Sequence, residues 1–334
     1  MKFRSKVNLC IAILATSATA LASAVSVSPA PDPQSLPTGA AIVSALKASE
    51  LSNKVPKGTI NPPLTATGLF WTSVNPATGN PSKPGCIIND AATTIPADIS
   101  TSCSFGDTAS STVIALVGDS NANAWIPAFD TWGFVNHVKV VAVVHAACAP
   151  WDRPWLPKDK PIWGDITERK CSVWRASMFS KISSLAPKYV FPVGIATTDK
   201  QLIFPSQSAV VASMASMIKR IGSKKAVLIE PVPQFSLASA VLACVTAHST
   251  NLNQCTVSKA AVSGSFMNQV VKTVATSQKV GVVSTQNLFC ATLTCPIFVT
   301  ISGKNYLLYE DGYHISHQYS QLIGAALPLK NFVK

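Results

Sequence analysis

Residues 113–125 have the sequence VIALVGDSNANAW, an apolar run that opens into Gly-Asp-Ser at 118–120. The run at 113–117 is short, uninterrupted and rich in β-branched residues, which is typical of a strand buried within a parallel sheet. The residues that follow, 122–132, are predicted to form a helix. The tripeptide therefore falls where a strand ends and a helix begins, which is where open α/β sheets bind their ligands.

A second segment, LLYEDGYHIS at residues 307–316, places Asp311 three residues before His314. This spacing puts both side chains on one turn, so that Asp311 is able to hold an imidazole N–H. Serine is a weak nucleophile that needs a base, and the base needs a group that orients it. We therefore predict that Ser120, His314 and Asp311 form a catalytic triad for acyl chemistry. The alternative is that both segments are ordinary turns with helix caps.

Apolar and amphipathic stretches alternate from residue 111 onward. Strands are predicted at 113–117, 138–145, 189–193, 226–229 and 280–283. Helices are predicted at 122–132, 171–185, 206–221, 259–277 and 316–327. This alternation predicts a three-layer α/β/α sandwich in which about five parallel strands are joined by right-handed crossovers. The sequence PVPQFS after the fourth strand is predicted to be a loop near the mouth of the site.

The N-terminus has the pattern of a secretory signal peptide. Three basic residues among the first six precede an apolar stretch at 7–21 that is too short to span a membrane comfortably. Small residues suited to cleavage follow at 19–24. We predict a signal peptide at 1–24 and a mature protein that is secreted or held in the extracytoplasmic cell envelope.

The rest of the chain is predicted to have three parts. Residues 25–65 are rich in Pro, Ser and Ala and are expected to form a linker with a short helix around 39–51. Residues 66–110 show few periodic signals and are expected to be an irregular segment that precedes the catalytic domain and is held by a disulfide. Residues 111–334 are expected to form the catalytic domain.

The nine cysteines indicate disulfides. Cys10 lies within the predicted signal peptide, and the others form an even number in an oxidising compartment. Eight cysteines allow about 105 pairings, so the connectivity stays open. A zinc site made by the last four cysteines is the alternative, which secretion and the spacing disfavour. Order along the chain suggests the pairs Cys86–Cys103, Cys148–Cys171, Cys244–Cys255 and Cys290–Cys295.

The chain is basic, with 27 Lys and Arg against 15 Asp and Glu and a net charge of +12. About +9 remains once the three basic residues of the signal peptide are removed. The basic residues are scattered along the sequence. We therefore predict a solvated basic surface that is able to attract anionic envelope polymers, and no nucleic-acid partner.

Two further motifs have competing interpretations. Trp151, Trp155 and Trp163 fall in a Pro- and Lys-rich loop between two cysteines. They are either a platform that stacks on sugar rings or, as we favour, side chains packed onto the domain. His314 and His317 have a spacing that suits a metal, but the triad explains His314 without one. We expect no metal and no cofactor.

Five longer segments carry a resemblance to one known family. They are CSFGDTASSTVIALVGDSNANAW, HAACAPW, KCSVWRASMFSKI, PVPQFSLASAVLAC and LFCATLTC…LLYEDGYHISHQYSQLI. Together with Gly-Asp-Ser and Asp-x-x-His, they resemble the SGNH (GDSL) hydrolase family. The likeness is to the extracytoplasmic SGNH domain fused to acyltransferase-3 membrane proteins, which are linked to O-acylation of cell-surface glycans. It extends over roughly residues 45–330 and supports the sequential cysteine pairs.

The resemblance implies a flavodoxin-like sheet and assigns roles to the triad. Ser120 would be the nucleophile and His314 the general base, with Asp311 orienting His314. The backbone N–H of Ser120 would supply one donor to the oxyanion. Hydrolysis needs the fewest assumptions, because water then takes the place of the acyl acceptor.

The sequence departs from the family pattern at three points. Asn121 stands where the fused domains usually have His. Of the Gly-x-Asn-Asp block that would carry an oxyanion asparagine, only Gly194 is recognisable. The membrane acyltransferase part is absent from this sequence, so the domain would take its acyl group from a soluble ester, from a separate membrane partner or from an ester that it hydrolyses. Asn121 or Asn123 is a candidate for the missing oxyanion donor, although either would equally serve as a helix cap.

The triad and the resemblance together predict a secreted serine esterase. Its substrates would be O-acyl groups, above all O-acetyl groups, on extracellular or cell-wall carbohydrate. It would accordingly bind an acylated glycan or a small ester. Two alternatives stay open: an O-acyltransferase that works with a membrane acyl donor, and a non-catalytic glycan-binding domain.

Overall fold

The computed structural model describes residues 36–64, 86–88, 92–195, 205–235 and 240–333. The predicted signal peptide and part of the two segments that follow it lie outside these residues. Where helices are described, none has the length and apolar character that crossing a lipid bilayer requires.

A parallel sheet forms the centre of the molecule, in the spatial order β5-β4-β8-β9-β11. The junction between β8 and β9 is a parallel bridge from Val190 to Ala226. This order is the flavodoxin-like 2-1-3-4-5 order, and it confirms the predicted α/β fold with about five parallel strands. The strands are β4 (Val113–Gly118), β5 (Lys139–His145), β8 (Tyr189–Val193), β9 (Val227–Ile229) and β11 (Gly281–Val283).

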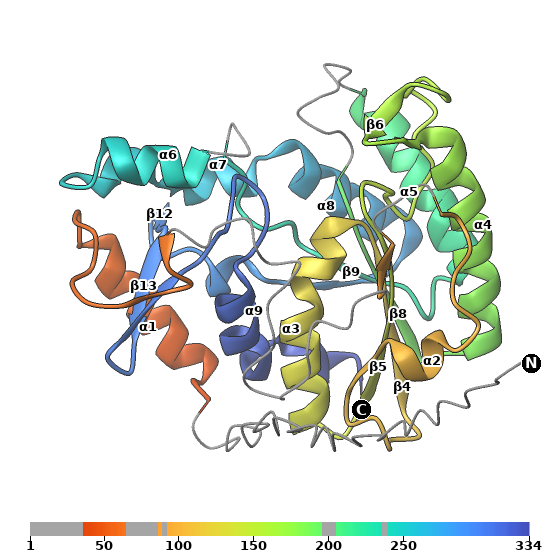
Figure 1. Ribbon diagram of the computed structural model, residues 1–334, viewed down its shortest axis with the longest axis horizontal. Coiled ribbons are helices and arrows are strands. Elements are labelled where there is room, and N and C mark those ends of the chain that lie inside the picture. The colour runs from red at the N-terminus through yellow and green to blue at the C-terminus, as the bar shows by residue number, and fades with distance from the viewer. Residues whose placement is uncertain (1–35, 65–85, 89–91, 196–204, 236–239, 334) are drawn as a thin grey trace, which may run out of the picture.

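Helices cover both faces of this sheet. Figure 1 shows α3 and α9 on one side and α4 and α5 on the other. Helix α8 packs against α5. Both faces of β4 and β5 are therefore buried, which explains their continuous apolar sequences. The helices are α3 (Ser120–Val135), α4 (Glu168–Leu185), α5 (Gln207–Ile221), α8 (Phe266–Gln278) and α9 (His317–Ile323).

The helix predicted at 259–277 is wrong as a single element. It consists of α7 (Lys259–Ser263) and α8, which are separated at Gly264 and Ser265. Ser265 has extended backbone before α8, and the buried side chain of Asn268 donates to the carbonyl of Val262 at 2.7 Å. The apolar period continues across this break, so periodicity alone does not detect it.

Other helix boundaries also differ from the sequence prediction. Helix α3 runs from Ser120 to Val135 and so extends beyond the predicted 122–132 at both ends. Helix α4 begins at Glu168, because the Thr167 hydroxyl caps it by accepting from Lys170 N–H at 3.3 Å. Helix α9 ends at Ile323 and continues as a 3-10 turn, Gly324–Ala326.

The N-terminal helix α1 (Gly39–Glu50) packs against the C-terminal part of the chain. Its Ile42 and Leu46 side chains are fully buried. The Glu50 carboxylate accepts from the backbone N–H groups of Leu293 at 2.7 Å and Thr294 at 2.6 Å. The predicted division of the chain at residues 65 and 110 stays a prediction.

Short elements complete the described structure. Strand β1 (Ile60–Asn61) pairs in parallel with β14 (Lys304–Leu307), which pairs in turn with β13 (Phe298–Ile301). Strand β2 (Ile87–Ile88) runs parallel and β3 (Ser104–Gly106) antiparallel to β5. The others are α2 (Ile99–Ser102), β6 (Pro161–Trp163), β7 (Ile166–Thr167), α6 (Ala240–Ala247), β10 (Val257–Ser258) and β12 (Thr294–Cys295).

The eight cysteines form four disulfides between sequential partners. No sulfur of the last four is therefore available as a zinc thiolate, and the zinc alternative is wrong. The Cα–Cα distances are 5.3 Å for Cys86–Cys103, 5.2 Å for Cys148–Cys171, 5.6 Å for Cys244–Cys255 and 3.9 Å for Cys290–Cys295.

Candidate active site

The turn between β4 and α3 carries the predicted nucleophile. Gly118 has a φ of +148°, and a Cβ at this position would lie 1.7 Å from the carbonyl oxygen of Val193 on β8. Only glycine fits so close to a neighbouring strand. Ser120 is the first residue of α3 and is half-buried. Its backbone N–H belongs to the first helical turn, whose N–H groups have no acceptor within the helix.

Asp119 organises this turn. Its fully buried carboxylate accepts from Asn121 N–H at 2.8 Å, from Asn121 Nδ2 at 3.2 Å and from Ile195 N–H at 2.9 Å. Burial raises the pKa of Asp119, while these hydrogen bonds and the nearby charge of Arg153 oppose the rise. Asp119 therefore ties the loop after β4 to the loop after β8. Sequence reasoning used Asp119 only as part of the motif; its position as an N-cap was the available signal.

The structure brings two of the three candidate oxyanion residues to Asp119. Asn121 is buried and directs one amide hydrogen to the Asp119 carboxylate. Gly194 lies against the same carboxylate, since a Cβ on it would be 3.0 Å from Asp119 Oδ2 and 2.8 Å from Pro150 Cδ. Asn123 is half-buried one residue beyond Ala122 on α3, and its backbone N–H donates to the Asp119 carbonyl at 3.1 Å.

Asp311 and His314 meet within one turn after β14. His314 Nδ1 lies 2.6 Å from Asp311 Oδ2, and Asp311 Oδ1 accepts from the backbone N–H groups of Tyr313 and His314 at 2.8 Å each. The side chain of His314 is 6% exposed. Backbone bonds from Glu310 N–H to the His314 carbonyl (3.1 Å) and from Ser316 N–H to the Leu308 carbonyl (2.9 Å) close the loop. A carboxylate in this position fixes the orientation of the imidazole.

Helix packing sets where this turn lies relative to Ser120. The Ser320 hydroxyl of α9 donates to the Ala124 carbonyl at 2.7 Å and accepts from Ala128 N–H at 3.2 Å. One turn later, Gly324 lies against Ala128 and Thr131. The two helices therefore run in parallel. Their N-termini, one carrying Ser120 and the other following His314, lie at the same end of the sheet.

A second contact brings the Asp311–His314 turn to the carboxyl ends of the strands. The loop after β9 ends at Phe235, whose N–H donates to the carbonyl of Gly312 at 2.6 Å. The Phe235 ring also packs edge-on against Tyr309, with centroids 5.0 Å apart. This is the PVPQFS segment, of which residues 231–235 are described.

The sequence profile described as "SGNH domain (fused to AT3 domains)" matches residues 85–328. The chain belongs to this SGNH family. The match extends from the first disulfide to the 3-10 turns after α9, so it includes both segments of the site. A comparison with curated proteins found no match.

Two solved structures are similar to this SGNH domain. The periplasmic domain of the lipopolysaccharide acetyltransferase of Salmonella ser. Paratyphi A has a TM-score of 0.53 and 13% identity, over 74% of this chain and 90% of that chain. The lipase/acylhydrolase from Enterococcus faecalis has a TM-score of 0.38 and 12% identity, over 67% of this chain and 97% of that chain. The first of these likenesses shows the fold.

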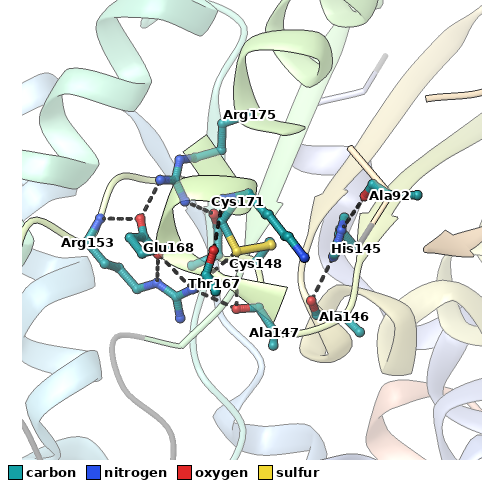
Figure 2. Close-up of a disulfide and its surroundings, with 12 residues drawn as sticks. Ala92, His145, Ala146, Ala147, Cys148, Arg153, Thr167, Glu168, Cys171 and Arg175 are labelled. Carbon is teal, nitrogen blue, oxygen red and sulfur yellow. Dashed lines mark hydrogen bonds and ion pairs between the residues drawn. A yellow bond between two sulfur atoms is a disulfide. The ribbon is translucent and has the colours of Figure 1, made fainter. Parts of the chain in front are cut away.

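The SGNH domain also has a buried ionic cluster beside the site, which the sequence analysis missed. Figure 2 shows Glu168 between Arg153 and Arg175, next to the Cys148–Cys171 disulfide. Arg153 Nε and N–H donate to the two Glu168 oxygens, each at 3.1 Å, and Arg175 Nη2 donates to Oε1. Burial lowers the pKa of Arg153, which Glu168 opposes. The cluster fastens the loop after β5 to α4.

The tryptophans of this loop have different environments. Trp151 is 2% exposed, and its ring lies beside Gly194, so the packed interpretation holds for this residue. Trp155 is half-buried, whereas Trp163 is 46% exposed. The loop therefore contributes a wall near Asp119 rather than an open platform of three indoles.

His317 is a second buried histidine, three residues after His314. Burial lowers the pKa of His317 to about 4, so its imidazole is neutral at ordinary pH. Its backbone N–H donates to Glu310 Oε1 at 3.3 Å. In the part of the chain that the structure describes, no group of three or more His, Cys, Asp or Glu side chains is placed to hold a metal ion.

Proposed function

We propose that this SGNH domain is an extracytoplasmic serine esterase that removes small O-acyl groups, chiefly O-acetyl, from carbohydrate. The observation that carries the proposal is the 2.6 Å contact between Asp311 Oδ2 and His314 Nδ1, at the end of the sheet where α3 begins with Ser120. A base held by a carboxylate near a helix-start serine is the arrangement that serine acyl chemistry needs.

The reaction proceeds in two steps. Ser120 Oγ attacks the ester carbonyl and passes its proton to His314 Nε2, and the departing sugar hydroxyl takes that proton as the acyl–Ser120 ester forms. Water then attacks the acyl–enzyme, again losing its proton to His314, and the carboxylic acid leaves as Ser120 regains a proton. Asp311 keeps the imidazole oriented and stabilises its cationic form.

The oxyanion that forms in each step needs donors. Ser120 N–H at the start of α3 is one, favoured by the positive end of the helix. Asn121 is the second candidate, because only one of its two amide hydrogens is directed to Asp119. Gly194 permits the close approach of the loop after β8 and donates no side-chain group.

One observation favours acyl transfer to a glycan as a second candidate function. The family profile is described as fused to AT3 domains, and one similar structure is the periplasmic domain of a lipopolysaccharide acetyltransferase. In that case a separate membrane acyltransferase would supply the acyl group, and a glycan hydroxyl would replace water in the second step. The location outside the cytoplasmic membrane is part of both proposals.

Hydrolysis of p-nitrophenyl acetate by the oxidised protein tests the proposal. We expect turnover that is lost in Ser120→Ala and in His314→Ala, while both variants keep the wild-type circular dichroism spectrum. Equal background rates of hydrolysis in the wild type and both variants would refute the esterase proposal. Addition of an oligosaccharide then separates the two candidates, because a transferase yields acylated glycan at the expense of free acetate.

A further inference from the structure

A small cavity lies beside the start of α3. Its walls come from the start of α3, the ends of β8 and β9, and helices α5 and α8. Most of the side chains that line it are apolar and buried. They include Trp125, Trp151, Met214, Leu228, Met267 and Val271.

The cavity is connected to both halves of the candidate site through neighbouring residues. Asn121, the neighbour of Ser120, forms part of one wall together with Gly194. Another wall is the loop after β9, up to Gln234. The next residue, Phe235, is hydrogen-bonded to Gly312 between Asp311 and His314. The cavity is therefore an apolar space next to the immediate neighbour of Ser120.

The size and chemistry of the cavity restrict what it accepts. Its volume is about 30 Å³, which is room for one or two waters rather than for a long chain. The one carboxylate in its wall is that of Glu230, which already accepts hydrogen bonds from Ser284 Oγ at 2.8 Å and Thr285 N–H at 3.0 Å. A charged or long occupant is therefore disfavoured, and a short apolar one fits.

We propose that this cavity receives the acyl group of the Ser120 ester, and that Met214 and Met267 limit the length of that group. Met214 is on α5 and Met267 on α8, two helices that pack together. Both methionines are buried, with exposures of 1% and 7%. The selected substrate class is esters of acetate and similarly short acids. This inference rests on the proposed function, whose nucleophile it shares.

A binding measurement tests the cavity without requiring turnover. In Ser120→Ala protein labelled with ¹³C-methyl methionine, Met214 and Met267 report on the cavity, and Met178 and Met217 are buried but do not line it. We expect ethyl acetate to shift the first two methyl resonances and leave the other two in place. Ethyl hexanoate should give no such shift.

A variant measurement tests the length limit. Met267→Ala should raise kcat/KM for p-nitrophenyl butyrate relative to acetate by at least about tenfold, a change of about 1.4 kcal/mol. Met217→Ala is the matched control, because it removes the same side chain from a buried position outside the cavity, and its ratio should stay at the wild-type value. Val271→Ala removes less volume and replaces Met267→Ala if that variant does not fold.

The two measurements separate this inference from the proposed function. Methyl shifts without Ser120-dependent turnover would keep the cavity as a binding site for a short ester but would overturn the esterase, and with it the role of the cavity for a Ser120 ester. Two results would overturn the role of the cavity in acyl binding and leave the esterase proposal intact. One is Ser120-dependent turnover while the Met214 and Met267 methyl resonances stay unshifted. The other is such turnover with an unchanged ratio of kcat/KM for butyrate to kcat/KM for acetate in the cavity variants. Absence of both shifts and turnover would overturn both.

Discussion

The carboxylate of Asp119 accepts a hydrogen bond from the backbone N–H of Ile195 at 2.9 Å, although 76 residues separate the two in sequence. The same carboxylate holds Asn121 N–H at 2.8 Å, immediately after Ser120. One buried acid thus positions the predicted nucleophile and one wall of the acyl cavity together.

Asp119→Asn should impair both stability and activity. The substitution replaces one acceptor oxygen with an NH₂ group, which then faces an N–H donor in a buried site. We expect a loss of about 1–3 kcal/mol in the free energy of unfolding, measured with urea. Turnover of p-nitrophenyl acetate should fall by at least about tenfold, because small misplacements of a nucleophile are costly. Asp165→Asn, at an exposed carboxylate, is the control, and an Asp119→Asn protein indistinguishable from it would refute the positioning role.

His317 should make the protein less stable in mild acid. Its pKa is lowered from 6.5 to about 4 by burial, so the unfolded chain binds a proton between these values that the folded chain does not. The loss begins as the pH falls below 6.5 and ends near 4. From pH 7 to pH 5 we expect a cost of about 2 kcal/mol from this residue.

Urea unfolding at pH 7 and pH 5 measures this cost in wild type and in His317→Gln, which should lose less stability on acidification. His248→Gln, at a residue without that burial, should behave as wild type. The contact from residue 317 N–H to Glu310 is a backbone contact and is retained in the variant. Identical pH dependence in wild type and His317→Gln would contradict the prediction.

Glu168→Gln should be strongly destabilising. The side chains of Arg153 and Arg175 are 0% and 2% exposed, and Glu168 is the buried carboxylate between them. Removal of its charge leaves two buried guanidinium groups without that compensation, which costs about 3–5 kcal/mol. Asp159→Asn is the matched control, because its pair with Arg169 is 69% and 62% exposed and should contribute less than about 1 kcal/mol. Equal unfolding midpoints for the two variants would contradict this account.

The Cys148–Cys171 disulfide should matter for activity as well as for stability. It closes a loop with a sequence separation of 23, against 11 for Cys244–Cys255, so each is expected to contribute about 3 kcal/mol through loop closure. Only the first loop carries Trp151, which lies beside Gly194 at the site. Paired Cys→Ala substitutions at 148 and 171 should therefore reduce esterase turnover at temperatures where the protein stays folded. Paired substitutions at 244 and 255 should leave esterase turnover unchanged. A larger loss of turnover from the pair at 244 and 255 than from the pair at 148 and 171 would contradict the prediction.

Local signals predicted the strands and the Asp311–His314 contact. The apolar run at 113–117 became β4 because continuous β-branched sequence suits a strand buried on both faces. The 2.6 Å contact between Asp311 and His314 follows from their three-residue spacing, since both belong to one tight turn. The sequential disulfides were predicted from the order of the cysteines along the chain, although sequence left other pairings open.

Long-range features were not predictable in this way. The break between α7 and α8 at Gly264 was not predicted, because the apolar spacing continues through it. The buried Asn268 side chain stabilises the break by donating a hydrogen bond to the Val262 carbonyl. The Arg153–Glu168–Arg175 cluster depends on how a disulfide-closed loop folds back onto α4. Neither residue type nor spacing identifies such partners.

The sequence by itself determined the family, the segments that form the parallel strands and the residue types of the candidate triad. Each of these depends on residues that are neighbours along the chain. Only the tertiary structure decided that Asp119 meets Ile195, that α9 lies parallel to α3, and that Met214 and Met267 line one cavity. These relationships arise from strand register and helix packing, where residues far apart in sequence compete to bury the same surface.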